Sequence, residues 1–247
     1  MADAERVPTG VPGLDEMIGG GLAKNQLSAV IGQVGTGRTM FTFQFLHEGL
    51  IRGEKCIFIS LYESTDYLAA KFVKRFPDSA DKIDKDMFFV RIMPENLLIF
   101  SDEIGGNITD MFQELGVNRV VVDPFSMFED MIISRDGFRA SDMHRVYSSF
   151  RTSNATTLLV TQSSLSDPLQ SKYGYAEVFA DNVACLFRYF PDNNYMKPYK
   201  LIFLILKLSG KIEKTARYVK YTNSGLFTLV DSFEHTKQSN IENAKTE

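Results

Sequence analysis

Residues 32–39, Gly-Gln-Val-Gly-Thr-Gly-Arg-Thr, match the phosphate-binding loop pattern G-x-x-x-x-G-K-[ST] at every fixed position except one. Arg38 stands where the pattern has lysine. Gly32, Gly35 and Gly37 allow the main chain to adopt positive φ angles, so that its N–H groups can approach a polyphosphate closely. The loop therefore predicts a bound nucleoside triphosphate, and the arginine bears on whether that ligand is hydrolysed.

The segments on either side of the loop have the order that the motif requires. Leu27–Ile31 is a short apolar run typical of a strand, and Met40–Leu50 has apolar residues at helical spacing. Thr39 begins this helix, and the N-terminus of a helix favours an anion. The Thr39 hydroxyl is suited to bind the Mg²⁺ that accompanies a nucleotide. The loop residues expected to contact the nucleotide are Gly32, Val34, Gly35, Thr36, Gly37, Arg38, Thr39 and Met40.

The substitution at Arg38 is not conservative. Arginine keeps the positive charge, but its planar guanidinium is longer and bulkier than the compact ammonium of lysine. We expect nucleotide affinity to be retained and catalysis to be reduced or altered.

Length and composition favour one large α/β domain. The chain has 247 residues, of which 44% are hydrophobic, enough for a substantial core. We expect residues 1–231 to form this domain and residues 232–247 to form a polar tail. The formal net charge of −4 argues against a dedicated nucleic-acid binder. We expect a cytoplasmic protein without membrane insertion, because no apolar run approaches the length of a membrane span and residues 1–6 lack the apolar stretch of a signal peptide.

The cysteines and histidines have no metal-ligand spacing. Cys56 and Cys185 lie in apolar, strand-like segments, which favours buried free thiols in a reducing cytosol. His47, His144 and His235 are scattered along the sequence, which favours surface or helix-face roles.

Strand-like and helix-like segments alternate through most of the chain, which predicts a mostly parallel sheet covered on both faces. The expected strands are Leu27–Ile31, Cys56–Ser60, Met87–Ile92, Arg119–Val122 and Thr157–Thr161. The expected helices are Met40–Leu50, Thr65–Phe76, Asp102–Leu115 and Ser141–Thr152. After Asp181 the sequence becomes strand-rich, with Asn182–Tyr189, Tyr199–Leu208, Ala216–Tyr221 and Leu226–Val230 divided by turn signals, which indicates an antiparallel extension of the same sheet.

Two further positions belong to the predicted nucleotide site. Asp123 ends the apolar run Arg119–Val122, where it would orient the Mg²⁺ shell directly or through water. Gln162 follows the strand Thr157–Thr161, and it is either a γ-phosphate sensor or an ordinary polar loop residue.

Several of these segments together resemble the KaiC-like branch of the RecA superfamily. The segments are Thr9–Asp15, Gly19–Leu22, the phosphate-binding loop, Arg119–Asp123 and Asp181–Val183. The resemblance covers roughly residues 7 to 230. It implies a RecA-type fold, ATP as the ligand, and hexameric rings with nucleotide between neighbouring subunits.

The chain departs from this family at positions that favour phosphoryl transfer. The family has two adjacent carboxylates after its second strand, and the first of them is placed to activate the attacking water. Here Tyr62 stands at the position of the first carboxylate, and Glu63 matches the second. Glu63 is a candidate base, although a one-residue shift on an extended segment reverses the side-chain direction. In the family pattern Lys-Leu-Arg-Gly, whose basic residues reach the neighbour's γ-phosphate, Lys207 is kept but Ser209 replaces arginine.

Since Arg38, Tyr62 and Ser209 are altered together, the leading hypothesis is an ATP-binding KaiC-like protein with weak or no hydrolysis. Its nucleotide-dependent assembly would regulate an unidentified protein partner. One alternative is an active RecA-type ATPase in which Arg38 serves the lysine role and Glu63 is the base. A second is a recombinase-related DNA-repair accessory protein, which the net charge disfavours.

Overall fold

The centre of the computed structural model is a nine-stranded sheet. The structure describes residues 5–92, 104–134, 136–191, 196, 198–209 and 211–231. The strands of the sheet are β3 (Leu27–Gly32), β4 (Cys56–Ser60), β5 (Met87–Arg91), β6 (Arg119–Val122), β7 (Thr156–Gln162), β8 (Asn182–Tyr189), β9 (Lys200–Leu208), β10 (Lys211–Tyr221) and β11 (Phe227–Val230). Across the sheet they follow the order β11-β10-β9-β8-β3-β7-β6-β4-β5.

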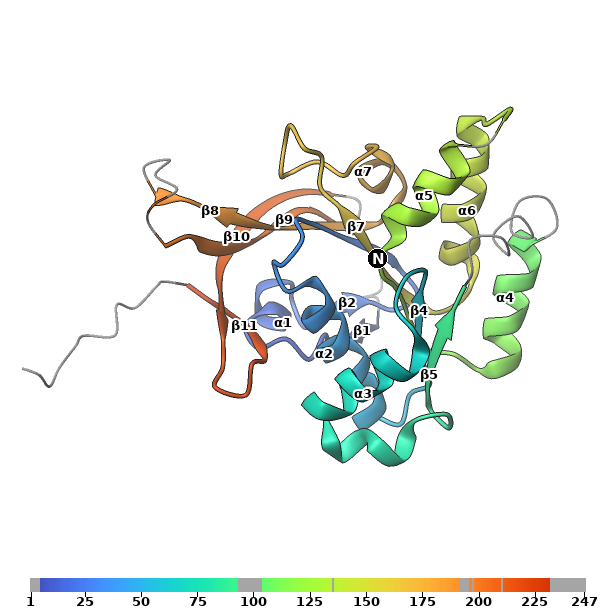
Figure 1. Cartoon of the computed structure of the whole chain (residues 1–247), viewed down its shortest axis with the longest axis horizontal. Coiled ribbons are helices and arrows are strands. Elements are labelled where there is room, and N and C mark those ends of the chain that lie inside the picture. The colour runs from blue at the N-terminus through green and yellow to red at the C-terminus, as the bar shows by residue number, and fades with distance from the viewer. Residues whose placement is uncertain are drawn as a thin grey trace, which may run out of the picture.

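The sheet has a parallel part and an antiparallel part. Neighbouring strands from β5 to β8 pair in parallel. From β8 to β11 the pairs are antiparallel, and these strands form the extension at the left of Figure 1. Every residue of β3, β4 and β6 is buried, as expected of parallel strands covered on both faces. The predicted α/β fold with an antiparallel C-terminal extension is therefore confirmed.

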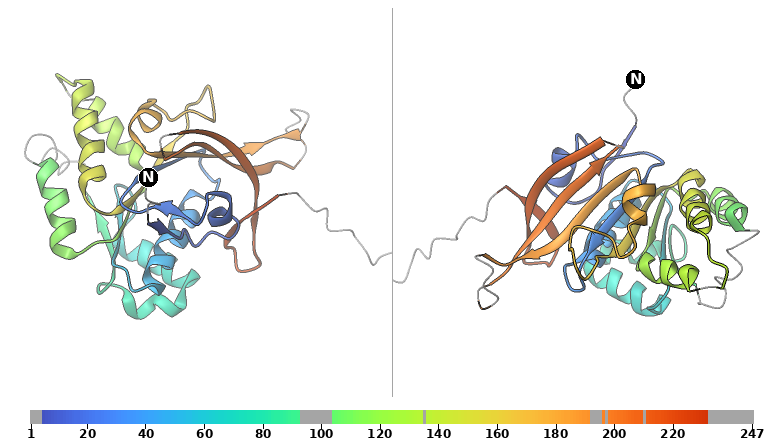
Figure 2. Two further views of the ribbon diagram at one scale, coloured as in Figure 1. Left: turned by 180° about the vertical axis from the view of Figure 1, so that it is seen from behind. Right: turned by 90° about the horizontal axis from the view of Figure 1, so that it is seen from above.

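Helices cover both faces of the parallel part. They are α1 (Leu14–Met17), α2 (Arg38–Ile51), α3 (Thr65–Arg75), α4 (Ile104–Leu115), α5 (Phe125–Ile133), α6 (Ala140–Thr152) and α7 (Tyr175–Phe179), with the 3₁₀ helix η1 (Pro77–Lys82) after α3. Figures 1 and 2 show α2 and α3 on one side of the sheet and α4, α5 and α6 on the other. Each side has its own core cluster, one containing Phe43 and Phe72, the other Phe125 and Phe150.

Helix α2 is buried on more than one face because several elements pack around it. Phe43 makes edge-to-face contacts with Phe58 and Phe72, with ring centroids 5.6 and 5.3 Å apart. Gln44, on another side of the helix, donates hydrogen bonds to the carbonyls of Gly10 and Phe227. The N-terminal segment, α2 and β11 are thus held together directly behind the phosphate-binding loop.

The sequence predicted neither a small second sheet nor several short helical elements. Helix α5 directly follows Asp123 and was not predicted, and neither were α1, α7 and η1. The second sheet pairs β1 (Arg6–Val7) with β2 (Leu22–Ala23) in antiparallel orientation. The helix predicted over Asp102–Leu115 is described from Ile104 onward. Asp102 and the predicted tail, residues 232–247, lie outside the described residues.

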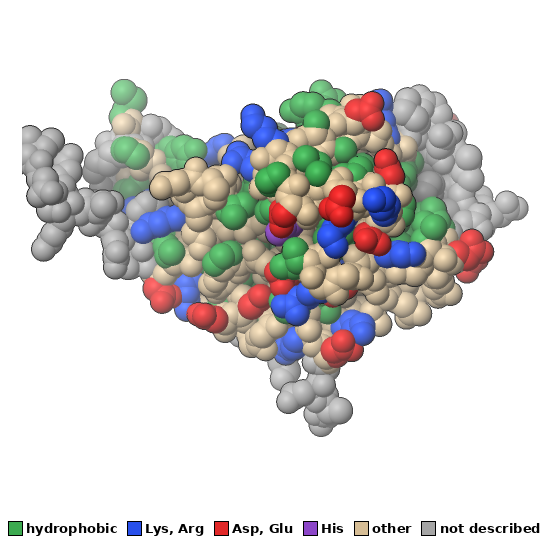
Figure 3. Space-filling view, turned by 90° about the horizontal axis from the view of Figure 1, so that it is seen from below, with side chains coloured by type: hydrophobic (Ala, Val, Ile, Leu, Met, Phe, Trp, Pro, Cys, Tyr) green, Lys and Arg blue, Asp and Glu red, His purple; other side chains and the backbone are tan. Residues whose placement is uncertain are grey.

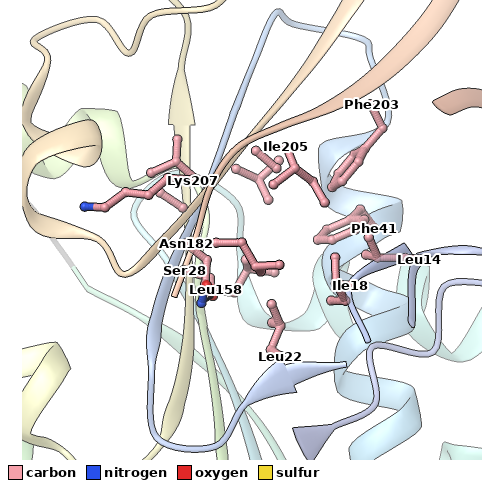
Figure 4. Close-up of a pocket in the computed structure, with 15 residues that line it drawn as sticks. Leu14, Ile18, Leu22, Ser28, Phe41, Leu158, Asn182, Phe203, Ile205 and Lys207 are labelled. Atoms are coloured by element: carbon pink, nitrogen blue, oxygen red, sulfur yellow. Dashed lines mark hydrogen bonds between the residues drawn. The ribbon is translucent and has the colours of Figure 1, made fainter. Parts of the chain in front are cut away.

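A small, mostly apolar cavity of about 30 Å³ lies between the N-terminal segment and the sheet. Side chains from α1, α2 and the strands surround it (Figure 4), among them Leu14, Ile18, Phe41, Phe203 and Ile205. Helices in the described part of the chain are all too short or too polar to cross a membrane.

Candidate functional site

The phosphate-binding loop connects β3 to α2 at the carboxyl end of the parallel strands. Gly35 and Gly37 have φ angles of 76° and 92°, which residues with a Cβ rarely adopt. Within the described residues, the N–H groups of these two glycines donate no hydrogen bond to another main-chain carbonyl. Free N–H groups at the start of a helix suit a polyphosphate, so the loop fits the predicted ligand.

The other loop residues line or support this cradle. Thr36 is fully buried, and its hydroxyl donates to the carbonyl of Gln33 at 2.8 Å, which closes the turn. Val34 is exposed, whereas Met40 is half-buried in the first turn of α2. Gly32 has no room for a Cβ, because the carbonyl oxygen of Leu186 would lie 2.9 Å from it.

Asp123 and Thr39, the two residues that the sequence offers as Mg²⁺ ligands, meet across the site. The main-chain N–H of Asp123 donates to Ile59 at the end of β4, which fixes the carboxylate at the edge of the sheet. The hydroxyl of Thr39 donates to Asp123 Oδ2 at 3.0 Å. Burial raises the pKa of Asp123 above its ordinary value, while the positive charge of Arg38 and the hydrogen bond from Thr39 oppose this shift.

Arg38 crosses the site toward β7. Its Nη1 donates to the main-chain carbonyl of Thr161 at 3.1 Å. Burial lowers the pKa of the guanidinium, and the nearby carboxylate of Asp123 opposes that shift. Gln162, the next residue after Thr161, pairs in register with Gly32 and is half-buried. The predicted sensor position thus lies beside the first glycine of the loop.

The segment that carries Tyr62 and Glu63 bends after β4 instead of continuing as a strand. Ser60 Oγ accepts hydrogen bonds from the N–H groups of Tyr62 and Glu63, at 3.2 and 2.9 Å. The segment is therefore not extended, as the sequence argument had assumed, and the direction of the Glu63 side chain does not follow from strand alternation. Glu63 lies close enough to Asp123 for its negative charge to raise the Asp123 pKa, and it forms an ion pair with Lys71 at 3.6 Å.

Tyr62, at the position of the missing first carboxylate, points into solvent and is 73% exposed. A tyrosine hydroxyl, unlike a carboxylate, is a poor general base toward water. Glu63 is the remaining carboxylate that could activate water.

Lys207 lies far from the loop of its own chain. It pairs with Val183 near the start of β8, at the opposite end of the parallel strands from the loop. Figure 4 shows its side chain pointing away from the apolar residues of the cavity. Its Nζ donates to the carbonyls of Ala180 and Glu177 at 2.7 and 3.3 Å. Any contact between Lys207 and a nucleotide would therefore involve another subunit.

Sequence reasoning missed three side chains that the fold brings to the site. Arg188 and Tyr221, from the antiparallel extension, donate hydrogen bonds to carbonyls of the loop. Glu129, from α5, accepts a hydrogen bond from Thr161, the residue whose carbonyl holds Arg38. No local signal marks these residues, because each contact joins segments that are distant in sequence.

The site combines an anion cradle with a weak metal position. Thr39 and Asp123 bring two side-chain oxygen atoms together, and no group of three His, Cys, Asp or Glu side chains suited to a metal occurs in the described residues. Mg²⁺ commonly binds through one or two protein ligands plus phosphate oxygens, so this donor set suits a metal that arrives with a nucleotide. On the face shown in Figure 3, Lys and Arg side chains are interspersed with Asp and Glu, unlike a continuous basic surface.

Comparisons with known proteins place the chain in a family and support its fold. A protein-family model described as "ATPase: KaiC" matches residues 7–219. The circadian clock protein KaiC3 of Synechocystis sp. is 26% identical over 188 residues, which cover 72% of this chain and 37% of that protein. A UPF0273 protein of Methanopyrus kandleri is 44% identical over 59 residues, 24% of this chain and 23% of that protein. These matches therefore span well under half the length of either relative.

The fold also matches a solved structure. The crystal structure of a KaiC-like protein from Pyrococcus horikoshii aligns with a TM-score of 0.72 at 22% identity, covering 92% of this chain and 99% of that one. At this level of identity the match supports the fold.

Proposed function

This chain belongs to the KaiC family of ATPases, and we propose that it binds Mg-ATP in the loop site and acts through nucleotide occupancy, with weak or no hydrolysis. Bound nucleotide would stabilise a hexameric ring or a partner-binding surface, because a ligand that binds one state shifts the population toward it. The partner is a protein that remains to be identified, and we place the assembly in the cytoplasm. Both cysteines are free thiols, in keeping with a reducing compartment.

The observation that carries this proposal is the contrast between two parts of one site. The cradle has free N–H groups at Gly35 and Gly37, and Thr39 and Asp123 face each other at 3.0 Å. Beside them, the position of the water-activating carboxylate holds Tyr62, which points into solvent. The first part favours binding, whereas the second removes a group that turnover needs.

Arg38 and Ser209 extend the same argument. The guanidinium of Arg38 is held by the carbonyl of Thr161, and a lysine ammonium would have a different reach and shape. Ser209 has no positive charge to offer a neighbour's γ-phosphate. Loss of one transition-state arginine lowers the rate by about 10³ to 10⁵ in related chemistry.

One observation favours the alternative of an active ATPase. Glu63 is close enough to Asp123 to influence its pKa, so a carboxylate does lie near the metal position. In that case Glu63 would activate water, and Lys71, which forms an ion pair with it at 3.6 Å, would help to position its carboxylate. The DNA-repair alternative stays a prediction, and salt-dependent binding of single-stranded DNA would support it.

The test measures ATP binding and turnover on the same purified sample at matched Mg²⁺. The natural protein, Arg38→Lys and Tyr62→Glu are compared, with Thr39→Ala as the variant that should bind Mg-ATP more weakly. Tight binding with negligible turnover, and a gain of turnover in Tyr62→Glu or Arg38→Lys, would support the proposal. Normal turnover that disappears in Glu63→Gln would instead establish the active ATPase.

A further inference from the structure

Two side chains from the antiparallel extension hold the phosphate-binding loop from outside. Arg188, in β8, donates from Nη2 to the carbonyl of Val34 at 2.7 Å. Tyr221, the last residue of β10, donates from its hydroxyl to the carbonyl of Thr36 at 3.2 Å. These two carbonyls belong to alternate peptide units of one short loop.

The peptide units that they hold are the ones that carry the free donors of the cradle. In a planar trans peptide, the C=O of one residue and the N–H of the next point in opposite directions. The bond to Val34 therefore turns the N–H of Gly35 away from Arg188, and the bond to Thr36 turns the N–H of Gly37 away from Tyr221. Both N–H groups then face the side where a polyphosphate would bind.

Close packing shows that this arrangement depends on glycine at both positions. A Cβ on Gly35 would lie 2.8 Å from Arg188 Nη2, and a Cβ on Gly37 would lie 1.7 Å from the Tyr221 hydroxyl oxygen. Glycine also lets a peptide unit rotate easily, so an unsupported loop would sample orientations in which these N–H groups point outward.

The two side chains are themselves held in place. The Arg188 guanidinium stacks on Tyr199, with its central carbon 5.3 Å from the ring centroid. The Tyr221 ring packs edge to face on Phe227, with centroids 6.0 Å apart. Burial raises the pKa of Tyr221, so the hydroxyl keeps its proton and remains a donor at neutral pH.

We propose that Arg188 and Tyr221 are positioning residues that orient the Val34–Gly35 and Thr36–Gly37 peptide units so that two N–H groups face the phosphates before nucleotide binds. This inference rests on the proposed function, since it concerns the same ATP site. Orientation in advance strengthens binding, because the loop loses less conformational freedom when the ligand arrives. The antiparallel extension thereby becomes part of the nucleotide site without contacting the phosphates.

The test compares Tyr221→Phe, which removes only the hydroxyl, and Arg188→Met, which removes the donors but keeps a long side chain. Arg188→Lys keeps a charged donor and should restore part of the affinity. Tyr189→Phe is the matched control, because Tyr189 is an exposed tyrosine in the same strand as Arg188. Binding of Mg-ATP and of inorganic tripolyphosphate with Mg²⁺ is measured by displacement of a fluorescent ATP analogue, and circular dichroism checks folding.

We expect Tyr221→Phe and Arg188→Met each to weaken both ligands by about threefold to tenfold, the effect of one lost hydrogen bond. Tyr189→Phe should bind like the natural protein. Unchanged affinity in both variants would overturn the inference and leave the proposed function intact. Weaker ATP binding with unchanged tripolyphosphate binding would also overturn it, because Tyr221 would then act on the base. If the natural protein binds neither ligand, the proposed function itself fails.

Discussion

The hydroxyl of Thr39 donates a 3.0 Å hydrogen bond to Asp123 Oδ2, across a sequence separation of 84 residues. Thr39 begins α2 directly after the loop, and Asp123 follows β6, so the fold alone brings them together. Hydroxyl and carboxylate oxygens are the ligands that Mg²⁺ prefers. The pair therefore marks where the metal that accompanies a nucleotide would lie.

Removal of either member of this pair should abolish the contribution of Mg²⁺ to ATP affinity. We expect Thr39→Ala and Asp123→Asn to weaken Mg-ATP binding by roughly 10- to 100-fold, the cost of losing one charge-assisted contact. Thr39→Ser keeps the hydroxyl and should bind normally. ATP titrations with Mg²⁺ and with EDTA check this. Equal Mg²⁺ dependence in Asp123→Asn and the natural protein would contradict the assignment of the metal site.

A buried carboxylate behind the site should make stability depend on pH. Glu129 is fully buried and accepts hydrogen bonds from Tyr147 at 2.9 Å and Thr161 at 3.1 Å. Burial raises its pKa from 4.5 to about 7, although both hydrogen bonds oppose this shift. Because the folded state holds this proton more tightly than the unfolded state, stability falls as the pH rises from about 4.5 to about 7.

Glu129→Gln should remove this part of the pH dependence. The neutral amide needs no proton, so the free energy of unfolding of the variant should not fall over this pH range. The difference in this free energy between the variant and the natural protein should therefore shift in favour of the variant by up to about 3 kcal/mol between acidic pH and pH above 7. Urea unfolding between pH 5 and pH 8 gives the difference directly. Glu114→Gln, at an exposed position, is the control and should show no such trend. A constant difference between Glu129→Gln and the natural protein would refute the shifted pKa.

Arg119 should be the most sensitive charged residue of the core. Its side chain is fully buried, bonds to Glu54 through Nε at 2.5 Å, and donates to the carbonyls of Pro8 and Phe45 at 2.7 and 2.8 Å. Removing one partner of a buried ion pair leaves the other groups uncompensated.

We expect Arg119→Ala to lower the free energy of unfolding by about 3 to 5 kcal/mol. Arg52→Ala breaks the exposed ion pair with Glu48 and should cost at most about 1 kcal/mol. Urea denaturation of both variants tests this comparison. Equal effects would show that the Arg119 bonds contribute little beyond those of a surface pair.

The two cysteines should resist modification while the protein is folded. Burial raises the pKa of both Cys56 and Cys185 to about 12, so roughly one thiol in ten thousand is ionised at pH 8. Ellman's reagent should therefore label neither cysteine in native protein within minutes, and both in guanidinium chloride. Rapid labelling of one thiol in the native state would show that its segment opens easily.

The strands, the phosphate-binding loop and Asp123 could be predicted because their signals are local. A run of apolar residues such as Arg119–Val122 forms a buried strand wherever it packs, and glycine spacing in residues 32–39 dictates a turn that few other sequences permit. Helix α5 was not predicted, although its buried residues Phe125, Phe128 and Ile132 have helical spacing, because a segment of nine residues is too short for periodicity alone to separate a helix from a strand.

The sequence by itself determined the class of fold, the family and the altered positions Arg38, Tyr62 and Ser209, since each depends on which residue occupies a place in a motif. Only the tertiary structure decided which side chains meet. It brought Glu63 near Asp123 and set Arg188 and Tyr221 against the loop. It also placed Lys207 beside the start of β8, at the end of the parallel strands opposite the loop. The physical reason is that periodicity reports the conformation of a segment, whereas these contacts arise from strand order and packing between segments far apart in the chain.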